Sequence, residues 1–151
     1  LCWSPGVPSK GAVDRSCPLS RLIEVLAIPG VTAFSLQTGE RAADREAEAC
    51  DALLSDVGSR LTDLADLAAA IEQLDLIICV DSATAHVAGA LGKETWVLLP
   101  YTSDWRWHSA DDDQPASVWY PSMRLFRQVT PGNWDSVFSA LHDALYERAI
   151  S

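Results

Sequence analysis

The sequence predicts an α/β fold, a doubly wound parallel sheet of about six strands that resembles a Rossmann domain. Apolar segments of strand length alternate with segments of helical periodicity along the whole chain, a pattern typical of βαβ units with right-handed crossovers. Residues 76–80 are also apolar without interruption, as expected of a strand that is covered on both faces. If the strands follow the usual order 3-2-1-4-5-6, the first and fourth are neighbours, and the loops at their carboxyl ends face each other.

The first half of the chain holds three of the predicted strands. Residues 1–3 are apolar and lead into a loop rich in Gly, Pro and Ser, so we interpret them as the end of a first strand. Residues 18–27 repeat apolar side chains at helical spacing, with Ser16 as the expected cap and Pro29-Gly30 as the end signal. A strand, a helix and a short extended segment are then predicted over residues 31–36, 41–54 and 54–57.

The second half repeats the alternation. A helix is predicted from Thr62-Asp63 to residue 74, because apolar residues recur there every three or four positions. After the central strand, Asp81 and Ser82 are N-cap residues of a helix that ends at Gly92. The remaining predicted elements are strands over residues 95–99 and 123–129, an irregular aromatic stretch over 100–121, and a final helix that opens at Gly132-Asn133.

Composition limits the classes of function. The chain has 151 residues, of which 48% are hydrophobic and 21% charged, as expected of one globular domain over residues 1–151. The net charge of −10 disfavours general affinity for nucleic acid or an anionic membrane. No apolar run approaches the roughly 20 residues of a membrane span, and the first residues do not resemble a signal peptide. We therefore expect a cytoplasmic location. Because the chain starts inside a strand, we also expect it to be part of a longer protein.

The cysteines and histidines do not identify a cofactor. Cys2, Cys17, Cys50 and Cys79 lack the short paired spacing of zinc, haem or redox sites, so we expect reduced, buried thiols and no cofactor. The spacing of the residues identifies no Ser-His-Asp or Cys-His catalytic arrangement, so the catalytic residues remain unknown. There is no Gly-x-Gly-x-x-Gly or Walker motif either, which disfavours dinucleotide binding and phosphoryl transfer.

The turn from the central strand into its helix is the strongest functional candidate. It lies at the carboxyl end of a strand, where ligands bind in open α/β sheets, and a helix start offers unpaired N–H groups to a phosphate. A phosphate site is expected from Ser4 and Lys10 of the first loop, from the N–H groups of Ala83, Thr84 and Ala85, and from Arg15. The alternative is that Asp81 and Ser82 only cap the helix and that His86 is a packed side chain.

Two features of the aromatic stretch allow more than one interpretation. Trp105-Arg106-Trp107 suits stacking on a base or sugar, or an interface with another domain, and the structural alternative is a packed aromatic cluster. Asp111 and Asp113 have the Asp-x-Asp spacing by which metal-dependent sugar transferases hold a divalent ion. Since no strand precedes them, we expect no metal site.

The motifs together resemble a known family. Residues 81–92 followed by Trp96-Val97-Leu98-Leu99-Pro100 are similar to the donor-site motif of the lipopolysaccharide heptosyltransferases. Further pieces resemble the bacterial subgroup fused to tetratricopeptide repeats, which is distantly similar to O-linked N-acetylglucosamine transferases. These pieces are Trp3-Ser4, Arg15-Ser16-Cys17-Pro18-Leu19, Ser35-Leu36-Gln37, Asp104-Trp105-Arg106-Trp107, Trp119-Tyr120-Pro121 and residues 124–128.

The resemblance implies a GT-B architecture, of which this chain matches only the second Rossmann-like domain, the one that binds the nucleotide-sugar. It implies donor contacts at Asp81, Ser82, Ala83 and His86, and a first phosphate loop at Ser4 and Lys10. The subgroup usually has a basic residue where Thr38 stands here, so no donor contact is carried over to that position. The acceptor site and the general base would belong to an N-terminal domain that is absent from this chain.

We therefore expect the donor-binding domain of a metal-independent glycosyltransferase, inactive by itself, that binds a nucleotide-diphosphate sugar. The alternative is a non-catalytic relative that kept the fold as a binding or interaction module, because fold alone does not determine function. The aromatic stretch is expected to be partly exposed, to face the missing domain, and to allow a homodimer of the isolated chain.

Overall fold

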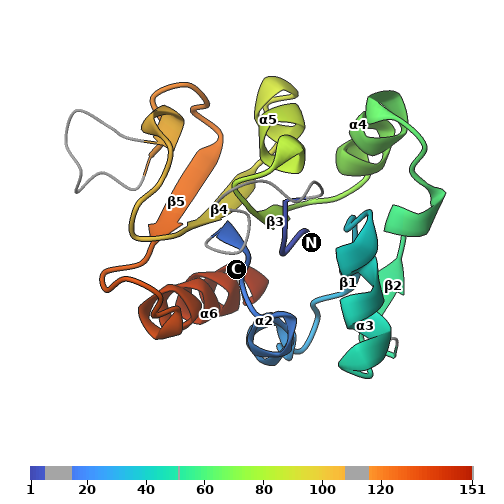
Figure 1. The fold of residues 1–151 in the computed structure, drawn as a ribbon, viewed down its shortest axis with the longest axis horizontal. Coiled ribbons are helices and arrows are strands. Elements are labelled where there is room, and N and C mark those ends of the chain that lie inside the picture. The colour runs from blue at the N-terminus through green and yellow to red at the C-terminus, as the bar shows by residue number, and fades with distance from the viewer. Residues whose placement is uncertain (6–14, 51, 108–115, 151) are drawn as a thin grey trace.

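A computed structural model describes residues 1–5, 15–50, 52–107 and 116–150 as an α/β fold (Figure 1). The strands are β1 (Ala33–Ser35), β2 (Leu54–Asp56), β3 (Ile77–Val80), β4 (Thr95–Leu99) and β5 (Met123–Arg127). The helices are α2 (Leu19–Leu26), α3 (Asp44–Ala47), α4 (Leu64–Glu72), α5 (Ala83–Ala90) and α6 (Asp135–Ala149). Short 3-10 turns occur at η1 (Glu40–Ala43), η2 (Gly58–Arg60) and η3 (Trp105–Trp107). Strands and helices thus follow the predicted order.

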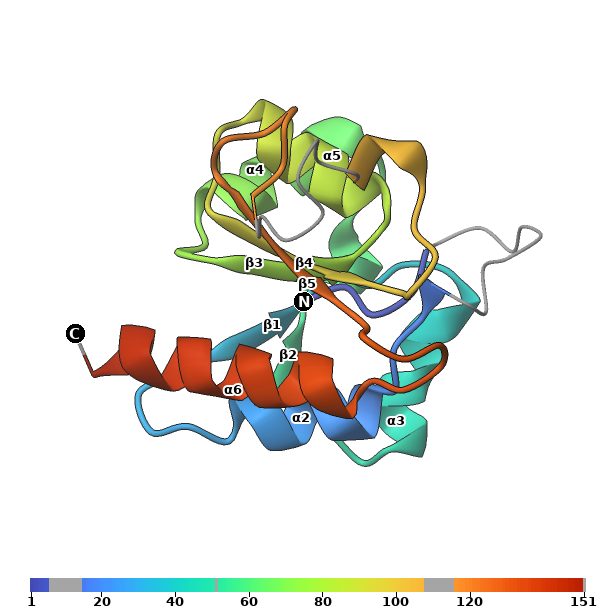
Figure 2. The ribbon, with the colours of Figure 1, turned by 90° about the vertical axis from the view of Figure 1, so that its left-hand side faces the viewer.

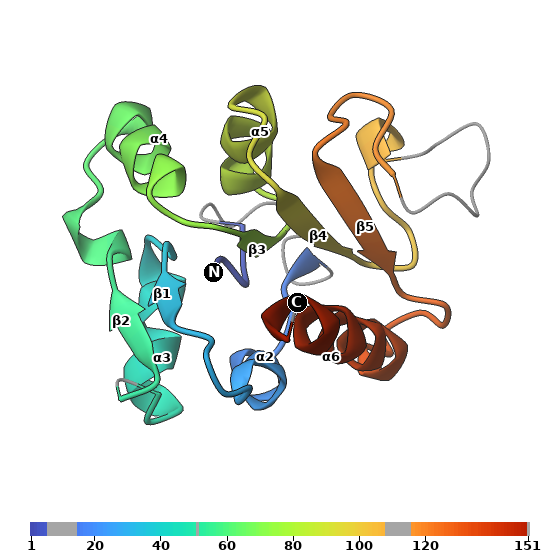
Figure 3. The ribbon, with the colours of Figure 1, turned by 180° about the vertical axis from the view of Figure 1, so that it is seen from behind.

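The strands form a parallel pair, β1-β2, and a parallel three-stranded sheet, β3-β4-β5. The first residues lie between β1 and β3 (Figure 3). The N–H of Leu36 donates to the carbonyl of Leu1 at 2.8 Å, and the N–H of Cys2 donates to the carbonyl of Ile78 at 3.1 Å. The predicted neighbours, residues 1–3 and the central strand, therefore do lie side by side.

The expected count of about six strands differs from the five strands among the described residues. Only Cys2 of the predicted first strand forms a ladder bridge, with Cys79. The physical reason is local. The N–H groups of Trp3 and Ser4 donate to the side chain of Gln37 at 3.1 and 3.0 Å, so these amides take a side-chain acceptor in place of a strand carbonyl.

Side chains alternate between two apolar layers, as strands buried on both faces require. On one face the β3 and β4 residues Ile78, Val80, Trp96 and Leu98 pack in the cluster that includes α2 and α6. On the other face Ile77, Cys79, Val97 and Leu99 pack in the cluster that includes α4 and α5. Figure 2 shows these helix pairs on opposite sides of the sheet. All four cysteines are buried thiols, as predicted, and burial raises the pKa of Cys17 to about 12.

The predicted helix over residues 41–54 is wrong in its second half. The helical segment ends at Ala47, and Ala49 adopts a φ of 52°, a left-handed conformation that interrupts a helix. The break lets Cys50 and Leu54 enter the core, while Leu53, which lies inside the predicted helix, is 63% exposed. Core packing of those two residues therefore overrides helical periodicity.

The predicted helix caps are partly correct. Asp63 caps α4, accepting hydrogen bonds from the N–H groups of Ala65 and Asp66, and Gly92 ends α5 with a φ of 68°. Ser16 is not a cap, since the N-cap position of α2 is Pro18. Helix α5 buries Thr84, Ala85 and Ala88, while Leu91, just after its last residue, is exposed.

Two leucines of α4 test the packing directly. Leu67 is 8% exposed and belongs to the core, whereas Leu64 is 63% exposed. We expect Leu67→Ala to lower the free energy of unfolding by about 2–4 kcal/mol, because it removes buried methyl groups and leaves a cavity. Leu64→Ala on the same helix is the matched control, with a change within about 0.5 kcal/mol. Urea unfolding followed by circular dichroism measures both, and equal losses would contradict the assignment of this helix face.

Candidate functional site

Polar residues gather where the first segment, β1 and β3 end at the carboxyl edge of the sheets. Ser4 follows the first segment, Gln37 follows β1 and Asp81 follows β3, and all three are buried. Cys2 joins them, because its Sγ lies 3.6 Å from Oε1 of Gln37 and 3.8 Å from Oγ of Ser82. The first loop and the turn at Asp81 are expected to face each other, and the described start of that loop, at Ser4, lies at the same edge as the turn.

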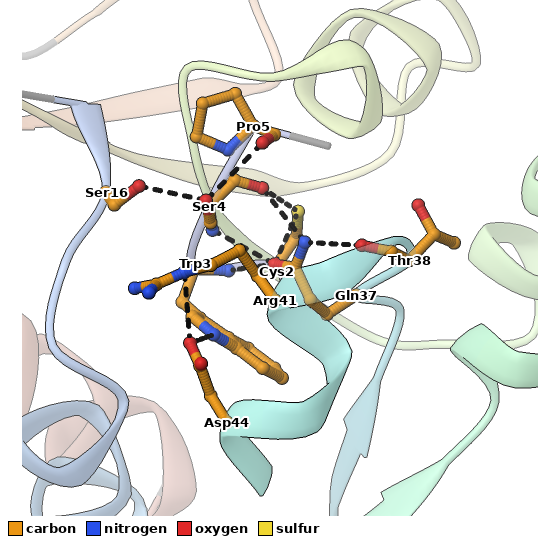
Figure 4. A network of polar contacts seen from close by, with 9 residues as sticks. All are labelled: Cys2, Trp3, Ser4, Pro5, Ser16, Gln37, Thr38, Arg41 and Asp44. Carbon is orange, nitrogen blue, oxygen red and sulfur yellow. Dashed lines mark hydrogen bonds and ion pairs between the residues drawn. The ribbon is translucent and has the colours of Figure 1, made fainter. Parts of the chain in front are cut away.

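Gln37 holds the first loop through its side-chain amide (Figure 4). Its Oε1 accepts hydrogen bonds from the N–H groups of Trp3 and Ser4, and its Nε2 donates to the carbonyls of Ser4 and Thr38, both at 3.1 Å. The side chain is 1% exposed, so these bonds are made away from water. Spacing in the sequence carried no signal for this role, because Trp3 and Ser4 lie more than 30 residues from Gln37 along the chain.

A second contact holds the segment Trp3-Ser4 against α3 (Figure 4). Nε1 of Trp3 donates to Oδ2 of Asp44 at 2.9 Å, and Nε of Arg41 lies 3.2 Å from the same oxygen. The Trp3 ring is fully buried in the layer of α2 and α6. The loop after Ser4 therefore starts from a fixed position.

An ion pair links the first loop to the turn after β3. Nη1 of Arg15 lies 3.3 Å from Oδ2 of Asp81, whose side chain is 4% exposed. Oγ of Ser4 lies 2.9 Å from Oγ of Ser16, beside that arginine in sequence. The structure thus brings Ser4, Arg15 and Asp81 to one place, whereas Lys10 lies outside the described residues.

Helix α5 begins at this edge without a side-chain cap. Ser82 occupies the N-cap position with an extended backbone, φ −154° and ψ 171°, but its side chain makes no capping hydrogen bond. The predicted N-cap position of Ser82 is therefore confirmed, but its hydroxyl makes no capping bond and faces Cys2 instead. The N–H groups in the first turn of a helix need acceptors from outside the helix, and those of Ala83 and Thr84 receive none from this cap.

His86 sits one turn into α5 against two aromatic rings. Its ring stacks on Trp107 with centroids 5.2 Å apart, and its Nδ1 lies 3.2 Å from the hydroxyl of Tyr120. Burial lowers the pKa of His86, and Arg106 lowers it further, against the opposing influence of Asp81 and Asp104. A neutral imidazole at this position carries one donor and one acceptor nitrogen.

The aromatic stretch divides into a packed part and an exposed part. Trp107 is buried under His86, while Trp105 and Trp119 meet edge to face with centroids 6.0 Å apart and are 65% and 59% exposed. The expected partial exposure of this cluster is confirmed. His108 and residues 111–113 lie outside the described residues.

The described parts of the chain contain neither a cluster of metal-ligand side chains nor a membrane-spanning helix. Among those residues, no group of three or more His, Cys, Asp or Glu side chains is placed to hold a metal ion. In the same residues, no helix combines the length and apolarity needed to cross a membrane.

The fold and this edge define a parallel α/β domain in which a helix begins at the end of a buried strand, a geometry that suits an anionic ligand. Residues 29–129 match the family model "Glycosyltransferase family 9 (heptosyltransferase)". The chain therefore belongs to glycosyltransferase family 9. The matched range includes Gln37 and the turn from Asp81 to His86, whereas Ser4 and Arg15 precede it.

The chain is also similar to the protein FlbA of Caulobacter vibrioides. The two are 32% identical over 131 residues, which make up 84% of this chain and 21% of that relative. The chain thus spans about a fifth of the length of this curated relative. No solved structure matches it at a significant level.

Replacing Gln37 tests how firmly the first loop is held. Gln37→Leu removes the acceptor of two buried N–H groups, and we expect the free energy of unfolding to fall by about 2–4 kcal/mol. Gln73→Leu at the exposed end of α4 is the control, with a change within about 0.5 kcal/mol. Urea unfolding measures both variants, and amide hydrogen exchange at Ser4 should become faster only in the first. Unchanged exchange at Ser4 would remove Gln37 from this role.

The lowered pKa of His86 predicts a pH dependence. Since the folded pKa lies below the ordinary value of 6.5, the neutral ring contributes stability that is complete above pH 6.5 and is lost as the pH falls through the folded pKa. NMR titration of the His86 ring should give a midpoint below 6.5, and His86→Gln should reduce the loss of stability in that pH range. A midpoint at or above 6.5 would show that burial does not dominate.

Proposed function

We propose that this chain is the nucleotide-sugar-binding domain of a metal-independent glycosyltransferase. The observation that carries the proposal is the uncapped start of α5 at the carboxyl edge, with Arg15 and Asp81 beside it. A nucleoside diphosphate brings negative charge, and both helix N–H groups and a guanidinium stabilise such charge. Membership of glycosyltransferase family 9 supports a nucleotide-sugar as the ligand.

Each residue then has a role in binding the donor. The N–H groups of Ala83 and Thr84 donate to phosphate oxygens, and the hydroxyl of Ser4 adds a further donor. Arg15, held by Asp81 at 3.3 Å, supplies positive charge next to them. Lys10 is proposed as a second cation from the same loop. When the glycosidic bond to the nucleotide breaks, these groups stabilise the charge that develops on the leaving diphosphate.

His86 is proposed to contact the donor as a neutral imidazole. Its stacking on Trp107 and its hydrogen bond to Tyr120 fix the plane of the ring, and burial disfavours its protonated form. With Nδ1 beside the Tyr120 hydroxyl, Nε2 remains for a hydroxyl or phosphate oxygen of the donor.

The wider assignment also remains a proposal. We place the chain as the second half of a GT-B enzyme from a bacterial subgroup fused to tetratricopeptide repeats, acting in the cytoplasm on a glycan or protein acceptor. The acceptor site and general base are assigned to an N-terminal domain, so this chain alone transfers no sugar. The small share of FlbA that the chain spans, 21%, is compatible with a longer protein.

The exposed aromatic surface is assigned to the cleft of the complete enzyme. Trp105 and Trp119 are large exposed rings, and Arg106 lies over Trp105 at 5.7 Å. We propose that Trp105 and Arg106 pack against the N-terminal domain or stack on a sugar, with Trp107 as the buried base of the cluster. Without that domain, the same surface is available for a homodimer.

Binding of nucleoside diphosphates tests the proposal. Calorimetric titration with UDP, ADP and GDP should show weak, salt-sensitive binding of at least one of them, because the charged part of the donor is shared by all three. His86→Ala should weaken this binding about tenfold or more, as expected when a hydrogen bond to a charged group is lost. His142→Ala, on the exposed face of α6, is the matched control and should bind like the natural chain.

Two outcomes would contradict the proposal. No binding at millimolar nucleotide by a well-folded sample would favour a non-catalytic interaction module. Binding that His86→Ala and His142→Ala leave equally intact would place the nucleotide elsewhere on the domain.

A further inference from the structure

Tyr120 lies on a short turn whose backbone is fixed just before β5. The N–H groups of Trp119 and Tyr120 both donate to Oγ of Ser117, at 3.3 Å each, and Ser117 is buried. The N–H of Met123, the first residue of β5, donates to the carbonyl of Tyr120 at 3.0 Å. The tyrosine therefore reaches α5 from a backbone that is held on both sides.

Gly89 makes room on α5 for the ring of Tyr120. It lies inside the helix, where glycine is a poor helix former. A Cβ added at this position would lie 2.6 Å from Cγ and Cδ1 of Tyr120 and 2.5 Å from Cε of Met123, closer than van der Waals contact allows. The ring thus packs directly on the helix backbone, and this packing is the reason for an unfavourable residue inside the helix.

This packing places the Tyr120 hydroxyl against one nitrogen of His86. The two rings are tilted by 57° with centroids 5.9 Å apart, and the hydroxyl lies 3.2 Å from Nδ1. Among the described residues, the hydroxyl has no other hydrogen-bond partner. A phenol O–H is a donor, and an imidazole nitrogen with a free lone pair is an acceptor. The hydrogen bond at one ring nitrogen sets which nitrogen carries the proton.

We propose that Tyr120, packed on Gly89, is a positioning residue that sets the tautomer of His86. Its hydroxyl donates to Nδ1, so the neutral ring carries its proton on Nε2 and donates from there. Because a helical Cα–Cβ bond tilts toward the start of its helix, the ring of His86 lies on the side of the candidate site. This inference rests on the proposed function and narrows it: the partner of Nε2 is an acceptor, for which a charged phosphate oxygen is best suited.

Tyr120→Phe tests the tautomer in the free chain, because it removes the hydroxyl and keeps the ring that packs on Gly89. We expect ring-nitrogen NMR at about pH 8, where histidine is neutral, to show the proton of His86 on Nε2. The Nδ1 signal should shift in the variant, since its hydrogen bond is lost. Tyr146→Phe, beside the exposed His142, is the matched control and should leave the His86 signals unchanged. A proton on Nδ1 in the natural chain, or an Nδ1 signal that Tyr120→Phe leaves in place, would overturn the proposal.

Nucleotide binding tests whether Tyr120 acts through His86. Tyr120→Phe should weaken binding of the best of UDP, ADP and GDP by about three- to tenfold. In the His86→Ala background it should have no further effect, since residues that act through one contact are not additive. Gly89→Ala should give the same two results, because its methyl group displaces the Tyr120 ring. Equal weakening by Tyr120→Phe in both backgrounds would show that the tyrosine contacts the ligand itself, and the positioning role would be wrong.

The two measurements separate this inference from the proposed function. If the natural chain binds no nucleotide, the proposed function fails, while the ring-nitrogen signals of the free chain still decide the tautomer. If nucleotide binds and the Nδ1 signal of His86 does not respond to Tyr120→Phe, the proposed function stands and the role of Tyr120 is refuted.

Discussion

The hydrogen bonds from Gln37 to the segment Trp3-Ser4 are the contact on which the carboxyl edge depends. The buried side-chain amide of Gln37 accepts hydrogen bonds from two N–H groups and donates to two carbonyls. These bonds replace strand pairing at the point where the chain leaves the sheet. The segment Cys2-Trp3-Ser4 is thereby held beside the turn after β3, where Cys2 contacts Ser82. A buried polar group of this kind is stabilising only if all its partners are present, so the loop and the end of β1 form one unit.

The network also explains why α5 starts as it does. Ser82 makes no capping bond and faces Cys2, whose thiol also lies near Gln37. The side chains around the helix start are thus committed to holding the loop, while the first N–H groups of the helix lack a side-chain acceptor from the cap. Arg15, which follows the same loop in sequence, pairs with Asp81 at 3.3 Å. A domain arranged in this way is suited to accept an anion from outside.

The sequence predicted those elements whose signals are local. Strand β4 coincides with the predicted residues 95–99, and Asp63 caps α4, because apolar runs and N-caps act over a few residues. The helix over residues 41–54 failed because Cys50 and Leu54 are drawn to the core through a left-handed Ala49. Packing between distant segments overrode periodicity there, and periodicity contains no information about that packing.

In the candidate site, too, local signals were predictable from the sequence and contacts between distant residues were not. Order of elements was sufficient to place Ser4 beside the turn at Asp81, since neighbouring parallel strands end at the same edge. The contacts of His86 with Trp107 and Tyr120 join residues 21 and 34 positions apart, and no spacing rule connects them. The role of Gln37 was equally hidden, because a buried glutamine and an exposed one look alike in sequence.

The central claim is that the diphosphate of a donor binds at the start of α5. A crystal structure of the chain with bound UDP, or with whichever nucleotide binds best, tests it most directly. The account predicts phosphate oxygens within hydrogen-bond distance of the N–H groups of Ala83 and Thr84, with the Arg15 guanidinium beside them. A nucleotide bound elsewhere on the domain, with the start of α5 unoccupied, would contradict it.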